Sequence, residues 1–249
     1  MKRSVFFCLF FGFLFTPLAT AQTPDTISFG GQNTFAAFFV YSNDSSHIVL
    51  GKAPDRKFTE VGFQYERRLI ANQRFVWKYA AELRPLIAES DPTATLTAAI
   101  TSPPPVMTIT NPPSAVLRCV AGATSFSFTD PTTGVLYAET LTTTCGRRWT
   151  YVEGLSPLGT RINLRPRSRW QPTASVLAGL LLSAKKIPID TAGSFNLTFQ
   201  FGAGVEYFRT PTQSIRLEYQ LQHFSNADTA PANPGVDNGL FKLTYAFRR

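Results

Sequence analysis

The sequence has little charge, few histidines and, beyond its first residues, no long hydrophobic run. Only 16% of its 249 residues are charged, with 24 Lys and Arg against 16 Asp and Glu, which gives a formal net charge of +8. A hydrophobic fraction of 44% is too high for a disordered chain, and 18 prolines and 16 glycines argue against long continuous helices. Coiled-coil, collagen-like and polytopic helical folds are therefore excluded, and the length allows one or two domains.

The first 21 residues have the pattern of a secretory signal peptide. The basic pair Lys2-Arg3 precedes an apolar run over residues 5–15, and the stretch closes on an Ala-Thr-Ala cleavage site. This run is shorter than the roughly 18 apolar residues that a membrane-spanning helix needs. We predict cleavage after Ala21, which leaves residues 22–249 as a single domain.

Cysteine and histidine are too few and too far apart for a metal site. The only histidines are His47 and His223, and no Cys-x-x-Cys or His-x-x-x-His spacing occurs. We therefore expect neither a metal nor a cofactor. Outside the signal peptide only Cys119 and Cys145 remain, and in an exported chain they are expected to form a disulfide. Such a bond stabilises a fold by on the order of 3 kcal/mol.

Polar and apolar residues alternate with a period of two, which is the signature of β-strands. Residues 195–207 place Phe, Leu, Ala, Val and Tyr on one face and Asn, Thr, Gln, Gly and Glu on the other. The pattern recurs at 215–222 and 241–247. Further strands are predicted upstream at 60–66 and 75–84, with weaker candidates at 34–41, 149–164 and 171–184, which makes eight strands.

The predicted connections between these strands alternate in length. Short turns are expected at 70–74, 165–170 and 209–213, on the same side as both termini. Longer connections lie on the other side, at 43–57, 89–148, 185–194 and 227–238. This asymmetry is typical of an outer-membrane β-barrel. A soluble lipid-carrying barrel also alternates, but it turns its apolar face inward; the export signal and the loop asymmetry favour the membrane barrel.

Residues 91–148 differ in composition from the rest of the chain. They are rich in Thr, Ser and Pro and contain a triple proline at 103–105 and a double proline at 112–113. We predict a long external loop insertion that is tied by the disulfide, and assign it no further structure.

Two polar residues lie at the end of the seventh predicted strand, on its lipid-facing side. Leu221 belongs to the apolar face, so a period of two carries His223 and Ser225 onto that face. Unpaired polar groups in hydrocarbon cost a few kcal/mol each. With a periplasmic N-terminus, this strand end lies at the outer-leaflet boundary. A His and a Ser there suit ester hydrolysis, as base and nucleophile, if a carboxylate orients the imidazole; the plain alternative is a polar rim.

The residues around this pair resemble a known family signature. The segment His-Phe-Ser-Asn-Ala at 223–227, followed by Asn-Pro-Gly at 233–235 and then Asp237, is similar to the C-terminal motif of the outer-membrane lipid A 3-O-deacylases, also called acyloxyacyl hydrolase-like proteins. The resemblance is weaker over 202–207 and fades before Trp149. It implies an eight-stranded barrel with a Ser/His/acid triad that faces the outer leaflet.

The resemblance also implies roles for five residues. His223 matches the family's base and Ser225 its nucleophile, while Asn226 and Asn233 match positions that support the site and bind the oxyanion. The family's acid is a glutamate, and the matching residue here is Asp237, which is shorter by one methylene group.

Together these observations predict an all-β fold, an eight-stranded antiparallel transmembrane β-barrel of the outer membrane with long external loops. Its expected activity is hydrolysis of the 3-O-linked 3-hydroxyacyl chain of lipid A. Lipopolysaccharide of the outer leaflet is the expected partner, nucleic acid is not, and a homodimer is left open. The alternative is a non-enzymatic small barrel, structural or adhesive, that retains the motif; the Asp at position 237 and the 91–148 insertion are its supports.

Overall fold

The computed structural model describes residues 29–42, 44–104 and 106–248, so the predicted signal peptide lies outside the described residues. Within these ranges no helix is long and apolar enough to cross a bilayer. The described chain forms one antiparallel sheet. Its strands are β1 (Asn33–Ser42), β2 (Lys57–Ala71), β3 (Phe75–Ser102), β4 (Met107–Thr110), β5 (Ser114–Ala115), β6 (Gly122–Thr129), β7 (Leu136–Leu164), β8 (Trp170–Ile187), β9 (Gly193–Thr210), β10 (Gln213–Ser225) and β11 (Val236–Arg248).

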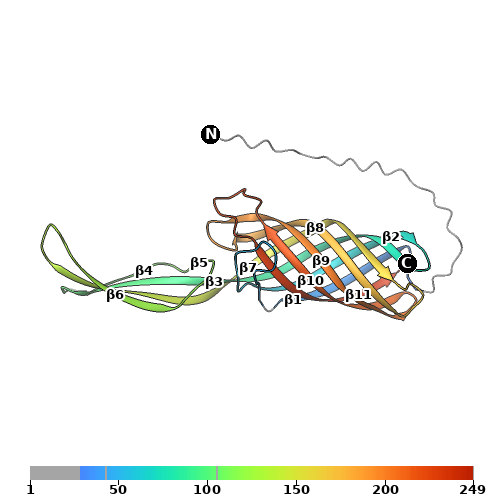
Figure 1. The fold of residues 1–249 in the computed structure, drawn as a ribbon, viewed down its shortest axis with the longest axis horizontal. Helices are drawn as coiled ribbons and strands as arrows, with labels where there is room; N and C mark the ends of the chain where they lie inside the picture. The colour runs from blue at the N-terminus through green and yellow to red at the C-terminus, as the bar shows by residue number, and fades with distance from the viewer. Residues whose placement is uncertain (1–28, 43, 105, 249) are drawn as a thin grey trace, which may run out of the picture.

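Eight of these strands close into a barrel (Figure 1). Going round the ring, the order is β1, β2, β3, β7, β8, β9, β10 and β11, and β11 pairs with β1 to close it. The predicted eight-stranded antiparallel barrel is confirmed. Short turns and the C-terminus lie at one end, and the longer connections lie at the other, which outer-membrane barrels turn to the outside.

The apolar side chains of the barrel point outward. On β10, Leu217 and Tyr219 are 58% and 46% exposed, whereas their neighbours Arg216, Glu218 and Gln220 are buried in the lumen. The other barrel strands alternate in the same way over most of their length. A water-soluble barrel requires the opposite arrangement, so the soluble lipid-carrying barrel is excluded, and this outer surface suits the hydrocarbon of a bilayer.

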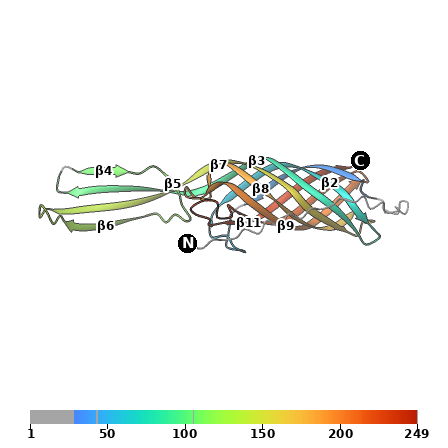
Figure 2. The same ribbon diagram turned by 90° about the horizontal axis from the view of Figure 1, so that it is seen from above.

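The segment 91–148 is not the structureless loop that its composition indicated. β3 and β7 continue well beyond the barrel as a paired ladder, and β4 and β6 add to their outer edges (Figure 2). We call this four-stranded projection, made of β4, β6 and residues 93–102 and 136–146 of β3 and β7, the arm. The predicted disulfide between Cys119 and Cys145 is present and ties the segment before β6 to β7.

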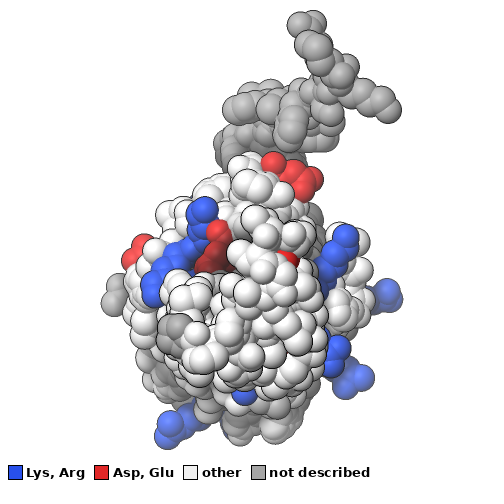
Figure 3. Space-filling view, turned by 90° about the vertical axis from the view of Figure 1, so that its left-hand side faces the viewer, with Lys and Arg blue, Asp and Glu red and all other residues white. Residues whose placement is uncertain are grey.

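The arm is almost uncharged. Between residues 93 and 146 the charged residues are Arg118, Asp130 and Glu139. Seen from the tip of the arm, most of the surface belongs to residues other than Lys, Arg, Asp and Glu, with charged side chains at several places around it (Figure 3). Opposite charge does not hold this sheet together, so strand pairing and side-chain contacts must do so.

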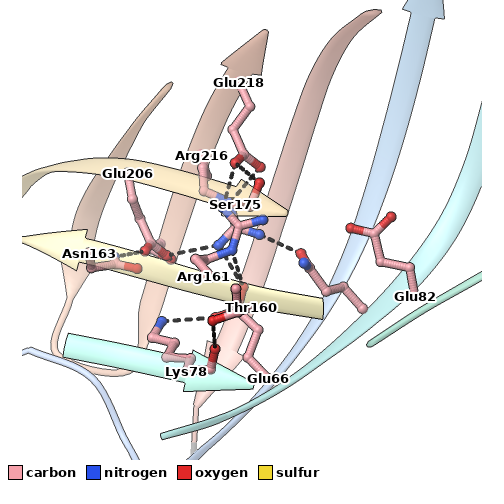
Figure 4. Close-up of polar contacts among 12 residues, drawn as sticks. Glu66, Lys78, Glu82, Thr160, Arg161, Asn163, Ser175, Glu206, Arg216 and Glu218 are labelled. Atoms are coloured by element: carbon pink, nitrogen blue, oxygen red, sulfur yellow. Dashed lines mark hydrogen bonds and ion pairs between the residues drawn. The ribbon is translucent and has the colours of Figure 1, made fainter. Parts of the chain in front are cut away.

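The half of the lumen nearer the short turns contains a network of buried ion pairs (Figure 4). Glu66 is the hub: its carboxylate accepts from Lys78 at 2.8 Å and from Arg161 and Arg216 at 2.9 Å each. Both arginines also pair with Glu218. All five side chains are buried, and each charge has a partner of opposite sign, which buried charges require.

The other half of the lumen, below the long loops, contains a cluster of buried apolar side chains. We call this cluster the plug; it is formed by Phe38, Val40, Ala53, Phe58, Ile87, Val152, Leu181, Ile187, Phe224, Val236 and Leu240. Above it, the buried Arg56 donates to the carbonyl oxygens of Val116 at 2.7 Å and Pro188 at 3.1 Å, and pairs with Asp91 at 3.3 Å. The plug and this cap close the barrel towards the outside.

Candidate active site

His223 and Asp237 face each other across the β10–β11 ladder near the outer end of the barrel. They are directly paired in the register, and His223 Nδ1 lies 2.6 Å from Asp237 Oδ1. Both side chains lie on the outer face, because the neighbouring Gln222, Phe224 and Asn238 point into the lumen and are buried. The His223 side chain is 23% exposed, so one edge of the imidazole remains open.

The second oxygen of Asp237 is held by the loop between β1 and β2. Oδ2 accepts three consecutive backbone N–H groups, from Val49 at 2.6 Å, Leu50 at 2.8 Å and Gly51 at 2.8 Å. Successive N–H groups that converge in this way form an anion-binding concavity, and hydrogen bonds to a carboxylate are stronger than neutral ones. The loop therefore fixes the carboxylate in its ionised form and aims its free oxygen at His223.

Two glycines allow the backbone to approach this pair closely. A Cβ on Gly51 would lie 2.5 Å from the backbone nitrogen of Asp237, so any side chain there would push the loop away from the acid. Gly235 has a positive φ of 61°, and a Cβ on it would lie 3.1 Å from Cε1 of His223. The glycine of the Asn-Pro-Gly motif thus leaves room for the imidazole.

Ser225 is the last residue of β10 and lies on the same outer face as His223, two residues further on. It is half-buried, and its hydroxyl makes no hydrogen bond with another residue in the described ranges. Because Asp237 occupies Nδ1, Nε2 is the imidazole nitrogen left for a hydroxyl. Catalytic hydrogen bonds in unliganded enzymes are often long and tighten only when substrate is bound.

Asn226 and Asn233 meet in the loop between β10 and β11. Asn233 Oδ1 accepts the backbone N–H of Asn226 at 3.1 Å, and Asn226 Nδ2 donates to the Ala232 carbonyl at 2.7 Å. Asn233 Nδ2 donates to Asp228 Oδ1 at 3.0 Å. The two residues clamp the loop that follows Ser225, and each amide group keeps one N–H hydrogen beyond these bonds.

An apolar groove of about 220 Å³ opens beside His223 on the outside of the barrel. Ile48, Val49 and Leu50 form one wall, and Phe199, Phe201 and Leu221 form the barrel side. His223 and Asp237 also line the groove. The loop that holds the acid through its backbone therefore shapes the groove with its side chains.

The sequence indicated the residues of β10 and β11 but not the contribution of residues 48–51. His47 lies in that loop and is exposed, and its Nδ1 contacts the Gly51 carbonyl at 2.7 Å. Three backbone N–H groups leave no mark on a sequence. The available signals were Gly51 and the three apolar residues before it, which are unusual in an external loop.

Comparison with known proteins gives one family match. A family model described as lipid A 3-O-deacylase (PagL) matches residues 122–247, half of the chain. No curated protein matches the sequence. Among solved structures, Neisserial surface protein A (NspA) is 8% identical, with a TM-score of 0.45, and the match covers 88% of this chain and 99% of that one. OprG from Pseudomonas aeruginosa is 10% identical, with a TM-score of 0.39, and the match covers 90% and 100%.

Proposed function

Because the chain belongs to the lipid A 3-O-deacylase (PagL) family, as its C-terminal motif predicted, we propose that it is an outer-membrane esterase that removes the 3-O-linked 3-hydroxyacyl chain of lipid A. Family membership gives the coarser description: a lipid A-modifying hydrolase of the outer membrane with lipopolysaccharide as its substrate. The specific ester and the roles of the residues below are our proposal.

The observation that carries the proposal is the His223–Asp237 pair beside an apolar groove on the lipid-facing side of the barrel. Lipid A acyl chains lie in the outer leaflet, so an ester near the headgroup would reach this strand end while its chain occupies the groove. A lumenal site could not do this, because ion pairs and the plug fill the lumen.

In the proposed reaction, Ser225 Oγ attacks the acyl carbonyl carbon while its proton passes to Nε2 of His223. Asp237 keeps the imidazole oriented and stabilises its protonated form. The tetrahedral intermediate collapses, the C–O bond to the sugar breaks, and His223 returns the proton to the leaving hydroxyl. Water then attacks the acyl-enzyme by the same route and releases the fatty acid. The free amide hydrogens of Asn226 and Asn233 are our candidates for oxyanion donors, worth roughly 3 kcal/mol if one is used.

Mass spectrometry of lipid A tests this proposal directly. Cells that express the protein should lose one 3-hydroxyacyl mass from lipid A, and cells that express Ser225→Ala should not. Heat-modifiable migration on gels must show that both barrels are folded in the outer membrane. Unchanged lipid A with a folded wild-type barrel would favour the non-enzymatic barrel instead.

We also propose that residues 1–21 are removed on export. The basic start, the short apolar run and the Ala-Thr-Ala site support cleavage after Ala21. N-terminal sequencing of protein from outer membranes should begin at Gln22.

A further inference from the structure

The two faces of the arm differ sharply in chemistry. On one face Phe128 and Tyr137 are paired in the register and their rings stack at 5.3 Å. Strand pairing places on that same face Leu96, Ile100, Met107, Ile109, Phe126 and Leu141. We call it the apolar arm face. Several of these side chains are widely open to solvent, Ile109 at 54% and Met107 at 49%.

The opposite face carries mainly hydroxyl groups. Ser125 Oγ lies 2.8 Å from Thr140 Oγ1, and Thr97 Oγ1 lies 3.2 Å from Thr110 Oγ1, each across neighbouring strands. Thr142 belongs to this hydroxyl arm face as well. The arm is thus an amphipathic sheet: its hydroxyl face suits contact with water, and no other strand of the described residues packs on its apolar face.

We propose that the apolar arm face is a self-association surface, on which two copies of this chain pack their arms together as a β-sandwich outside the membrane. Four-stranded sheets with one apolar face are ordinarily stable only when that face is covered. Strand spacing and rise give this face roughly 450 Å² in projection. This is the size of the largest apolar patch on a typical monomer, and two such faces packed together would bury roughly 900 Å² in total, which is the range of weak interfaces.

Membrane geometry favours a second copy as the occupant. Two barrels in one membrane point the same way, so a two-fold axis that relates them runs along the membrane normal. The arm strands run roughly along the barrel axis (Figures 1 and 2). Rotation about such an axis keeps the strands of both arms aligned, which is the usual packing of two sheets in a sandwich. Pairing of the two β6 edges under the same rotation would leave both apolar faces uncovered.

Confinement to the membrane compensates for the modest area. Barrels that diffuse in one plane with fixed orientation meet at a high effective concentration, and a weak contact is then occupied.

One residue opposes the contact: Glu139 lies on the apolar arm face, paired with Phe126 and Ile100. It is the single charged residue among the described residues of that face, and its carboxylate loses water when the face is covered.

Adjacent alanines in β3 give a matched test. Ala98 lies on the apolar arm face and Ala99 on the hydroxyl arm face. Whole cells that express Ala98→Cys or Ala99→Cys would be treated with a short bismaleimide, because packed sheets lie about 10 Å apart. We expect at least about tenfold more cross-linked dimer from Ala98→Cys. Equal cross-linking of both variants, none from either, or products with other proteins only would overturn the proposal.

Three further substitutions in the Ala98→Cys background distinguish specific packing of the two arms from random collision. Phe126→Asp should reduce the dimer about tenfold, whereas Ser127→Asp, on the hydroxyl arm face, should leave it unchanged. Glu139→Gln should increase it. Heat-modifiable migration checks the fold of each variant. An increase with Phe126→Asp, or equal loss with Ser127→Asp, would contradict the proposal. The test uses no enzymatic readout, so it is independent of the proposed function.

Discussion

At the scale of single residues, the acid of the proposed triad is shorter than that of its family, and its contact with the histidine is short all the same. Directly opposed residues of antiparallel strands have Cβ atoms only about 5 Å apart. Asp237 and His223 occupy such a pair, so an aspartate spans the gap at 2.6 Å. The departure from glutamate therefore does not separate the acid from the base.

Asp237→Asn tests whether the charge matters. The amide keeps the size of the side chain but no longer stabilises the protonated imidazole, and with its oxygen on the three N–H donors its NH₂ group faces Nδ1 of His223. We expect kcat for lipid A deacylation in detergent micelles to fall roughly 10³- to 10⁴-fold with KM little changed. The kcat of Asp237→Glu should lie between those of Asp237→Asn and the wild type, because the longer side chain displaces the carboxylate from the loop. Wild-type turnover by Asp237→Asn would exclude the acid from the mechanism.

At this scale the sequence was informative where side chains alone carry the information. Alternation placed His223 and Ser225 on the outer face, and the burial of Gln222 and Phe224 confirms it. The hydrogen-bond partners of Asn226 and Asn233 could not be predicted, because they depend on how a loop of ten residues folds back.

At the scale of elements, the loop between β1 and β2 is a structural part of the site. Ser46 N–H donates to the Asp237 carbonyl at 3.1 Å, and Lys52 N–H donates to the Pro234 carbonyl at 2.8 Å. These two hydrogen bonds lie on either side of the three N–H groups and attach the loop to β11 and to the segment that leads into it. The position of the β1–β2 loop therefore determines whether the Asp237 carboxylate keeps its three backbone hydrogen bonds.

Gly51→Ala should therefore impair catalysis without unfolding the barrel. The added Cβ would lie 2.5 Å from the Asp237 nitrogen, which forces residues 49–51 away from the carboxylate. We expect at least a tenfold loss of kcat with normal heat-modifiable migration. Gly122→Ala is the control, because a Cβ there meets nothing within 4 Å. Equal activity of both variants would show that the loop does not position the acid.

The arm shows where composition misled. Prolines and hydroxyl residues indicated a loop, yet Ser-Phe-Ser-Phe at 125–128 already alternates with the period of a strand. Short strands that carry Ser and Thr on one face resemble loops in composition, and only long-range pairing with β7 distinguishes them.

At the scale of the whole molecule, buried ion pairs in the lumen stabilise the barrel. Glu66→Gln would leave Lys78, Arg161 and Arg216 with less opposing charge in a buried space. Removal of one partner from a buried ion-pair group costs about 3–5 kcal/mol. We expect a matching loss in the free energy of unfolding, measured by urea titration in detergent. Glu153→Gln, on the exposed surface of β7, should be neutral; a neutral Glu66→Gln would mean that the network is dispensable.

In the proposed mechanism, the pairing of His223 with Asp237 makes catalytic competence a late event in biogenesis. The two residues come from different strands, and a slip of one residue between β10 and β11 would break the pair and turn one side chain inward. The N–H groups that hold the acid arrive with β1, which joins β11 only when the ring closes. If the chain is exported and acts as proposed, it would cross the periplasm with its reactive groups still apart, and insertion into the membrane would itself be the activating step.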